Sequence, residues 1–204
     1  MGLLSALLAL ISGPALSDTE KGIAAYKRGD YPLALRELQS GAEAGDEQAL
    51  YNLGVFYSEG KAAPADAGKA IGYYRRAAEA GSALAAFNLA QALRKGNGVA
   101  QDYVEAAKWY EQAARNGDYR AGNELGLLYV EGKGVDRDLV EGFAWIYPAT
   151  HAAIMDDNAL QNAMQLASML DRSQLDEAQQ RGKVYYERYF EPNSKLVDAI
   201  RKGQ

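Results

Sequence analysis

Residues 49–81 read ALYNLGVFYSEGKAAPADAGKAIGYYRRAAEAG, and this stretch decides the fold of the chain. Its apolar residues recur at intervals of three to four over 47–59 and again over 67–80, which is the spacing of one face of an α-helix. The loop between the two segments ends in Asp66, and an aspartate suits the N-cap of the second helix. Gly81 follows that helix and supplies the left-handed conformation that closes many helices. The stretch therefore predicts two helices joined by a loop.

The same pattern recurs along the chain with a period of 36 residues. It superimposes Leu53, Leu89 and Leu125, and it aligns a set of aspartates that we expect to be N-caps, namely Asp30, Asp66, Asp102 and Asp138. Small residues at 54, 90 and 126 allow the two helices of each hairpin to approach closely. A single hairpin of this kind cannot bury its apolar face alone, so the pattern predicts hairpins stacked into an α-solenoid.

The composition of the 204 residues agrees with an all-α fold and excludes several kinds of chemistry. The chain has 37 Ala and 21 Gly but only 8 Val, 6 Ile and 2 Thr, so residues that favour strands are scarce. It has no cysteine, which excludes disulfides, thiolate nucleophiles and cysteine-ligated metals. It has a single histidine, which excludes any site that needs two imidazoles. A formal net charge of -5 with evenly mixed signs argues against a general nucleic-acid binder. We expect no cofactor and no metal.

The residues 49–81, 85–117 and 121–150 resemble Sel1-like repeats, a family related to the tetratricopeptide repeats. The shared pattern includes Leu125-Gly126 and the Trp109-Tyr110 pair of the second helix. The resemblance implies a right-handed α-solenoid of helix-turn-helix repeats closed by C-terminal capping helices. The units expected are a signal peptide (1–17), an N-terminal half-repeat or capping hairpin (18–46), three repeats (47–82, 83–118 and 119–154) and the capping helices (155–204).

Three positions depart from the repeat pattern. Ala62-Ala63 stand where the family has Gly-Val, so we expect another path for that loop. Pro148 lies inside the second helix of the third repeat and should kink or end it. Ala153 stands where Gly117 ends the preceding repeat, so the pattern predicts a helix that continues towards Met155.

The N-terminal residues have the pattern of an export signal. An apolar run over 3–11 precedes Gly13-Pro14, and small residues stand at the positions before a cleavage expected after Ser17. The run is too short to span a bilayer, so no stable membrane insertion is expected. These features predict a periplasmic or secreted protein, although no basic residue precedes the run, and a buried N-terminal helix is the alternative.

The resemblance to tetratricopeptide arrays implies that one face of each first helix lines a concave groove. The residues expected to bind a partner there are Tyr51, Val55, Phe87, Gln91, Arg94, Asn123 and Leu127. The wider set projected onto this face also includes Gln48, Ser58, Glu59, Leu84, Lys95, Arg120, Val130 and Glu131. Aromatic and arginine side chains often anchor protein interfaces, so this set suits an extended peptide or a partner helix. The alternative for Phe87 is packing against the neighbouring hairpin.

The remaining conspicuous residues have structural explanations. Recurring apolar side chains are assigned to the core: Leu53, Tyr57, Trp109, Leu125, Tyr129 and Trp145. His151 lies near Asp156-Asp157 and suggests a general base, but the favoured interpretation is an exposed or capped histidine at a helix irregularity. In the stretch 171–190 we expect Ser173 as an N-cap with Asp176 completing a capping box, and Tyr185, Tyr186 and Tyr189 sealing the end of the array.

These observations favour a non-catalytic scaffold of the bacterial cell envelope that binds another protein or a peptide. The alternative is an envelope enzyme or binder that acts on peptidoglycan-type or β-lactam ligands. A cytosolic regulator is a third possibility if the N-terminus is not cleaved. The partner and the oligomeric state are not encoded in a recognisable way.

Overall fold

The computed structural model describes residues 17–61, 64–151 and 157–192, and all regular structure within them is helical. The helices form an α-solenoid, as the repeat pattern predicts. Their bounds are α1 (Asp18–Lys27), α2 (Tyr31–Glu43), α3 (Glu47–Glu59), α4 (Ala67–Glu79), α5 (Ala83–Lys95), α6 (Tyr103–Arg115), α7 (Tyr119–Glu131), α8 (Leu139–Thr150), α9 (Asp157–Ala167), α10 (Arg172–Tyr185) and a π-helical turn η2 (Tyr186–Phe190).

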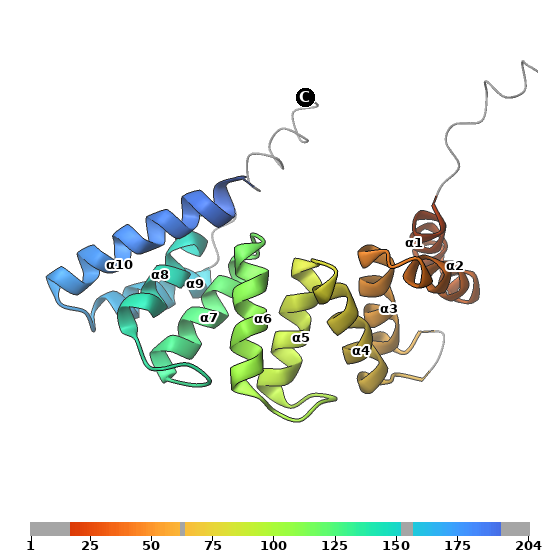
Figure 1. The fold of residues 1–204 in the computed structure, drawn as a ribbon, viewed down its shortest axis with the longest axis horizontal. Helices are drawn as coiled ribbons and strands as arrows, with labels where there is room; N and C mark the ends of the chain where they lie inside the picture. Colours follow the sequence, from red (N-terminus) through yellow and green to blue (C-terminus); the bar gives the residue numbers. More distant parts are fainter. Residues whose placement is uncertain (1–16, 62–63, 152–156, 193–204) are drawn as a thin grey trace, which may run out of the picture.

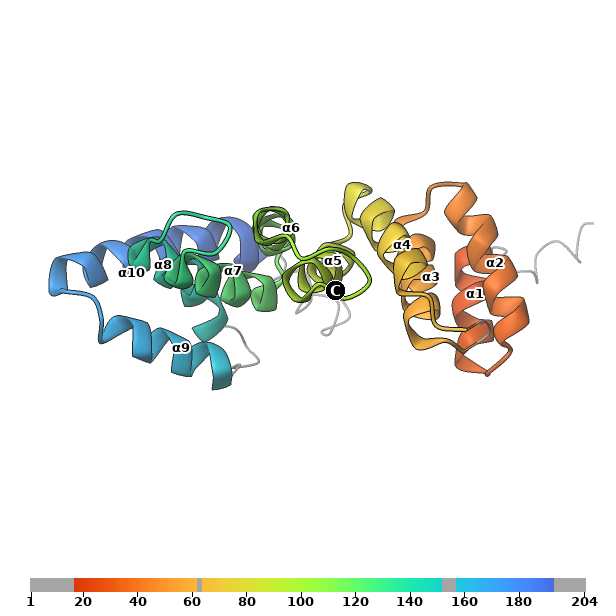
Figure 2. The same ribbon diagram turned by 90° about the horizontal axis from the view of Figure 1, so that it is seen from below.

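Consecutive helices pair into four hairpins: α1 with α2, α3 with α4, α5 with α6, and α7 with α8. The second helix of each hairpin packs on the first helix of the next, so the hairpins follow one another along the long axis of the molecule (Figures 1 and 2). The segment 18–46 thus contains a complete hairpin, α1 and α2. Its connecting loop is much shorter than those of the following hairpins.

Aspartate side chains start the second helix of every hairpin. The carboxylates of Asp30, Asp66, Asp102 and Asp138 each accept a hydrogen bond from a backbone N–H three residues later, at 2.9 to 3.2 Å. Such a bond satisfies a donor that the first turn of a helix would otherwise leave free. The predicted N-caps are therefore confirmed, and capping accounts for these four aspartates without a catalytic role.

Small residues permit the close contact of helices that the period predicts. A Cβ on Gly54 would lie 2.5 Å from the ring of Tyr74, and one on Gly126 would lie 2.5 Å from the carbonyl oxygen of Gly142. Glycine is also required in the loops, because Gly134 has a φ of +74° and lies against the backbone of Tyr103 on the previous repeat. These contacts join the elements of one hairpin and also link consecutive hairpins.

Several expectations fall wholly or partly on residues outside the described ranges. The leader expected at 1–17 lies outside them except for Ser17, and so do Ala62-Ala63 and Ala153. Ser17 itself is the N-cap of α1: its Oγ accepts from the backbone N–H of Glu20 at 3.2 Å, and the Glu20 carboxylate accepts from the N–H of Ser17 at 2.8 Å. This reciprocal pair is a capping box.

The C-terminal helices cover α8 from two sides. α10 packs along α8, with Gly182 against the ring of Tyr147, and α9 also contacts α8. Figure 2 shows α9 and α10 diverging from the end of the array. The ring of Trp145 on α8 lies 4.5 Å from that of Tyr185 and 6.0 Å from that of Tyr189, measured between ring centroids. These tyrosines therefore cover a tryptophan of the last repeat.

Two details of this region differ from expectation or resolve an open point. The N-cap of α10 is Asp171, which forms a capping box with Gln174, so the prediction of Ser173 with Asp176 is wrong by two residues. Asp171 and Gln174 have the same spacing as the predicted pair and form the same reciprocal hydrogen bonds, so the helix begins two residues before the predicted start. Pro148 does not end its helix at once, because α8 continues to Thr150 before His151 caps it.

The predicted core is confirmed for most residues but not for all. Leu53, Tyr57, Leu125 and Trp145 are buried. Trp109 is only partly buried, and so is Tyr129. The two tryptophans differ because the C-terminal tyrosines cover Trp145. The indole N–H of the partly buried Trp109 donates to Glu105 at 3.1 Å.

Within the ranges described, no helix combines the length and apolar character needed to cross a membrane.

Candidate interaction groove

The first helices α3, α5 and α7 present one face to the inside of the array. The guanidinium carbon of Arg120 on α7 lies 4.3 Å from the ring centroid of Phe87 on α5. First helices of successive hairpins also contact one another, α1 with α3 and α3 with α5. We call this inner face the groove and define it by Tyr51, Leu84, Phe87, Gln91 and Arg120.

Phe87 and Asn123 are not open contacts, and for them the expected exposure is wrong. Phe87 is 6% exposed because it lies between Arg120 and the ring of Tyr110, whose centroid is 5.9 Å away. This is the alternative of packing against the neighbouring hairpin. Asn123 is 7% exposed, and its Oδ1 accepts a hydrogen bond at 3.0 Å from Asn162 on α9. The C-terminal helix α9 thus covers part of the third repeat.

The other residues expected in the groove are partly exposed. Tyr51 lies beside Tyr74, with 6.0 Å between ring centroids, and Val55 and Gln91 are half-buried. Leu127 lines a cavity of about 230 Å³ together with Asn162 and other residues of α9 and its surroundings. Gln91 and Arg120 line different cavities, and α9 lies beside Leu127.

Arg94 belongs to a charged cluster at the junction of the second and third repeats. Its Nη2 lies 3.7 Å from Oε2 of Glu124 on α7. Tyr110 is fully buried beside this pair, and burial raises the pKa of its hydroxyl. The charge of the nearby Arg94 offsets part of this rise in the pKa of Tyr110. Within the described residues, neither Nε of Arg94 nor the hydroxyl of Tyr110 makes a hydrogen bond of normal geometry. Arg94 therefore closes this junction more than it extends into the groove.

A cavity of about 570 Å³ opens at one end of the groove, between the starts of α5 and α7. Its walls include Leu84, which is 47% exposed, together with Tyr119 and Arg120. An exposed leucine next to an aromatic ring and a guanidinium is the combination that anchors many protein interfaces. Leu84 and Arg120 belong to the wider set projected from the sequence.

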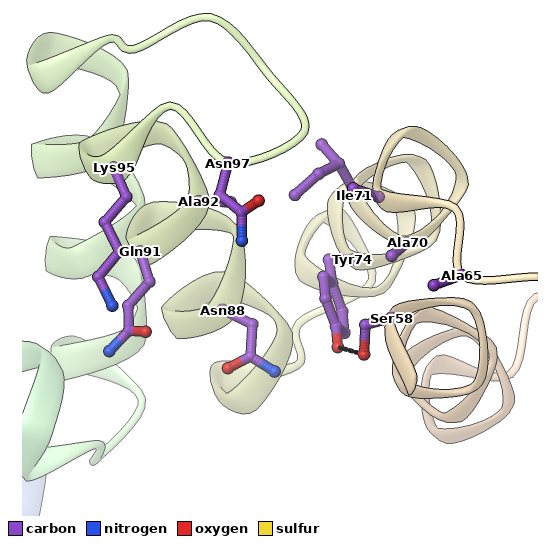
Figure 3. A pocket seen from close by; sticks show the side chains of 11 residues that line it. Ser58, Ala65, Ala70, Ile71, Tyr74, Asn88, Gln91, Ala92, Lys95 and Asn97 are labelled. Atoms are coloured by element: carbon purple, nitrogen blue, oxygen red, sulfur yellow. Dashed lines mark hydrogen bonds between the residues drawn. The ribbon is translucent and has the colours of Figure 1, made fainter. Parts of the chain in front are cut away.

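A second cavity, of about 390 Å³, lies between α4 and α5 (Figure 3). The sequence assigns to the face of the groove three residues that the structure places around this cavity, namely Ser58, Gln91 and Lys95. Tyr74 and Asn88 also line it and were not among the predicted residues. The hydroxyl of Tyr74 on α4 reaches the cavity beside Ser58, 3.4 Å from Oγ.

His151 has the structural position that the sequence favoured. It is exposed at the end of α8, its Nδ1 lies 3.1 Å from the carbonyl oxygen of Tyr147, and its ring stacks on that of Tyr147 with 4.1 Å between centroids. Asp156 lies outside the described residues. Within them, no group of three or more histidine, cysteine, aspartate or glutamate side chains is arranged to hold a metal ion.

Stacked helical hairpins with an inner groove define a repeat solenoid of the kind that presents a surface to a partner. The model of the Sel1 repeat family matches residues 47–82, 83–118 and 120–151, which together are just over half of the chain. The chain therefore belongs to the Sel1 repeat family.

Two solved structures are similar to this one. A Sel1 repeat protein from Oxalobacter formigenes is 29% identical, with a TM-score of 0.67, and the match covers 83% of this chain and 70% of that protein. A protective antigen of uropathogenic Escherichia coli strains, which has the same kind of repeat fold, is 24% identical with a TM-score of 0.62. That match covers 90% of this chain but only 47% of the antigen, so this chain spans about half of the antigen's length. No curated protein matches the chain significantly.

Proposed function

We propose that this protein is an exported scaffold of the bacterial cell envelope that holds a peptide or helix of another protein in its groove. Sel1 repeat proteins generally act as scaffolds for protein–protein interaction and are typically non-catalytic. The observation that carries the proposal for this chain is the contact of Arg120 on the third repeat with Phe87 on the second, next to the exposed Leu84. A ligand on this face would touch the second and third repeats at once.

The groove offers a partner both apolar area and directed polar contacts. Leu84 and Tyr51 supply exposed apolar surface, whereas Arg120 and Gln91 supply donors. Arg120 is half-exposed and is held at the rim by the carboxylate of Asp118, with 2.5 Å between Nη2 and Oδ2. A guanidinium fixed in this way loses little conformational freedom when it binds a carboxylate or a carbonyl of a partner.

The proposal of export depends on the apolar run at 3–11 and on the small residues before Asp18. Cleavage after Ser17 would remove the capping box of α1 and place a new amino group at the positive end of that helix. We therefore expect the mature chain to compensate by pairing this amine with Asp18 or Glu20. Sequencing of the N-terminus of the protein purified from cells tests the proposal, and an intact Met1 contradicts export.

Photo-crosslinking tests the groove. A photoreactive amino acid at position 84 should crosslink one partner in cells, and Arg120→Ala with Tyr51→Ala should abolish the product without changing the helical circular dichroism. The matched control places the photoreactive residue at Lys108, which is exposed on α6. An unchanged product in the double variant, or the same product from position 108, contradicts binding in the groove.

A further inference from the structure

The cavity between α4 and α5 lies where the first repeat has small residues and the second repeat has long ones. Ser58, Ala65 and Ala67 border this cavity of about 390 Å³. One period later, the corresponding positions are occupied by Arg94, Gln101 and Tyr103. The first repeat therefore lacks a guanidinium, an amide and a phenol ring that the second repeat holds at the corresponding positions.

In the second repeat these long side chains bind one another and the backbone. Nε2 of Gln101 donates to the carbonyl oxygen of Arg94 at 2.8 Å and to the hydroxyl of Tyr103 at 3.1 Å. The third repeat repeats the backbone contact, since Nε of Arg137 donates to the carbonyl of Val130 at 3.0 Å. Ala65 stands at the corresponding position of the first repeat and has no side-chain group that could donate to the carbonyl of Ser58.

The cavity has an apolar side and a polar side. Ala67, Ala70 and Ile71 of α4 form the apolar part. The polar part is formed by the amides of Asn88, Gln91 and Asn97, the amine of Lys95, and the hydroxyls of Ser58 and Tyr74. Figure 3 shows Asn88 and Asn97 opposite Tyr74 and Ile71 of α4, with Gln91 and Lys95 farther from α4. No carboxylate belongs to this lining.

We propose that this cavity receives one tyrosine side chain of the bound partner, in place of the tyrosine that the second repeat supplies from its own chain. This inference rests on the proposed binding of a partner in the groove. An aromatic ring fits the apolar wall beside Ala67, where the second repeat has Tyr103, and a hydroxyl can bond to the amides opposite. An arginine or lysine side chain would meet Lys95 without a carboxylate to offset the repulsion. A glutamine would leave the volume of the ring empty.

A titration with small probes tests the cavity without knowledge of the partner. N-acetyl-tyrosinamide added to the ¹⁵N-labelled full chain should shift the resonances of Ser58, Asn88 and Asn97, with a dissociation constant in the millimolar range. N-acetyl-phenylalaninamide should bind about fivefold more weakly, which is the effect of one lost hydrogen bond. The double variant Ala65→Gln with Ala67→Tyr restores the pattern of the second repeat, so it should fill the cavity and abolish these shifts.

Two controls keep the result interpretable. Lys108→Ala changes an exposed residue of α6 outside this cavity and should leave the titration unchanged. If the double variant does not fold by circular dichroism, Ala65→Gln alone should weaken binding of the tyrosine probe. Equal binding of both aromatic probes, absence of shifts at Ser58, or unchanged binding by a folded filled variant overturns the proposal.

Tighter binding of N-acetyl-aspartamide than of the tyrosine probe also overturns it, because the cavity would then be an anion site at Lys95. The titration and the crosslinking experiment distinguish failure of the tyrosine pocket from failure of the groove. Crosslinking from position 84 with no binding of the tyrosine probe leaves the groove intact and rejects only the tyrosine pocket. Probe binding with no crosslinked partner rejects the groove as a partner site while the cavity stands.

Discussion

The guanidinium of Arg120 covers the ring of Phe87 across the junction of the second and third repeats, 4.3 Å from its centroid. Asp118 holds the same guanidinium from the other side, so its orientation is fixed before any partner arrives. The contact therefore divides the two residues by role. Phe87 contributes to the packing between repeats, whereas Arg120 remains half-exposed and available for binding.

This division predicts different effects of truncating the two side chains. Phe87→Ala should lower the free energy of unfolding by about 3–5 kcal/mol, because it empties a buried site. Arg120→Ala should lower it by only about 0.5–1 kcal/mol, the size of an exposed cation–π contact. Urea denaturation followed by circular dichroism measures both. Equal losses of stability in the two variants would contradict this difference in role between Phe87 and Arg120.

A missing N-cap gives a second prediction. Ser82 precedes α5 at the position where Asp46 and Asp118 cap α3 and α7, but its side chain makes no capping hydrogen bond. Ser82→Asp should therefore raise the free energy of unfolding by about 0.5–1 kcal/mol, from the new bond and from the attraction of a carboxylate to the start of the helix. The reverse change, Asp118→Ser, serves as the control and should be destabilising. A melting temperature that is unchanged in both variants contradicts the capping argument.

The repeat period allowed the architecture to be predicted from the sequence. The binding site was harder to predict, because equivalent positions of different repeats have different neighbours. A 36-residue shift identifies which residues are equivalent, so the capping aspartates and the close contacts at Gly54 and Gly126 follow from the sequence. The period says nothing about elements outside it. The packing of α9 over Asn123 and of α10 over Trp145 comes from the non-repeating C-terminal residues, and these contacts decide which equivalent positions are buried.

The cavity between α4 and α5 shows a second limit. Comparison of the repeats in the sequence reveals that Ala65 and Ala67 are smaller than Gln101 and Tyr103, and this was the signal available. That the difference leaves a space, and that Asn88 and Tyr74 border it, depends on the angle between α4 and α5. Periodicity does not encode that angle, because each junction adjusts to the side chains that fill it.

The pair of Arg75 and Glu105 predicts a dependence of stability on pH. Arg75, and to a smaller extent the indole N–H of Trp109, hold the pKa of Glu105 below its ordinary value of 4.5. A carboxyl whose pKa is lowered by folding stabilises the folded state above its unfolded pKa, and this stability is lost as the pH falls through the folded pKa. Glu105→Gln should therefore cost stability at about pH 7 and much less at about pH 3. Arg75→Gln should show the same convergence in urea denaturation. A loss that is constant with pH contradicts the pairing.

Two glycines in different surroundings give the most direct test of how the loops hold consecutive repeats together. Gly134 has a φ of +74°, and a Cβ there would overlap the backbone of Tyr103. Gly72 lies in the middle of α4, where a Cβ would meet nothing within 4 Å. Gly134→Ala should thus be destabilising by more than about 1 kcal/mol, through strain and displacement of the loop, whereas Gly72→Ala should stabilise by about 0.5–1 kcal/mol through helix propensity. Hydrogen exchange should locate the first loss at the start of α6, against which the loop packs. If Gly134→Ala is neutral, or if its exchange increases only within its own loop, the loop does not secure the neighbouring repeat.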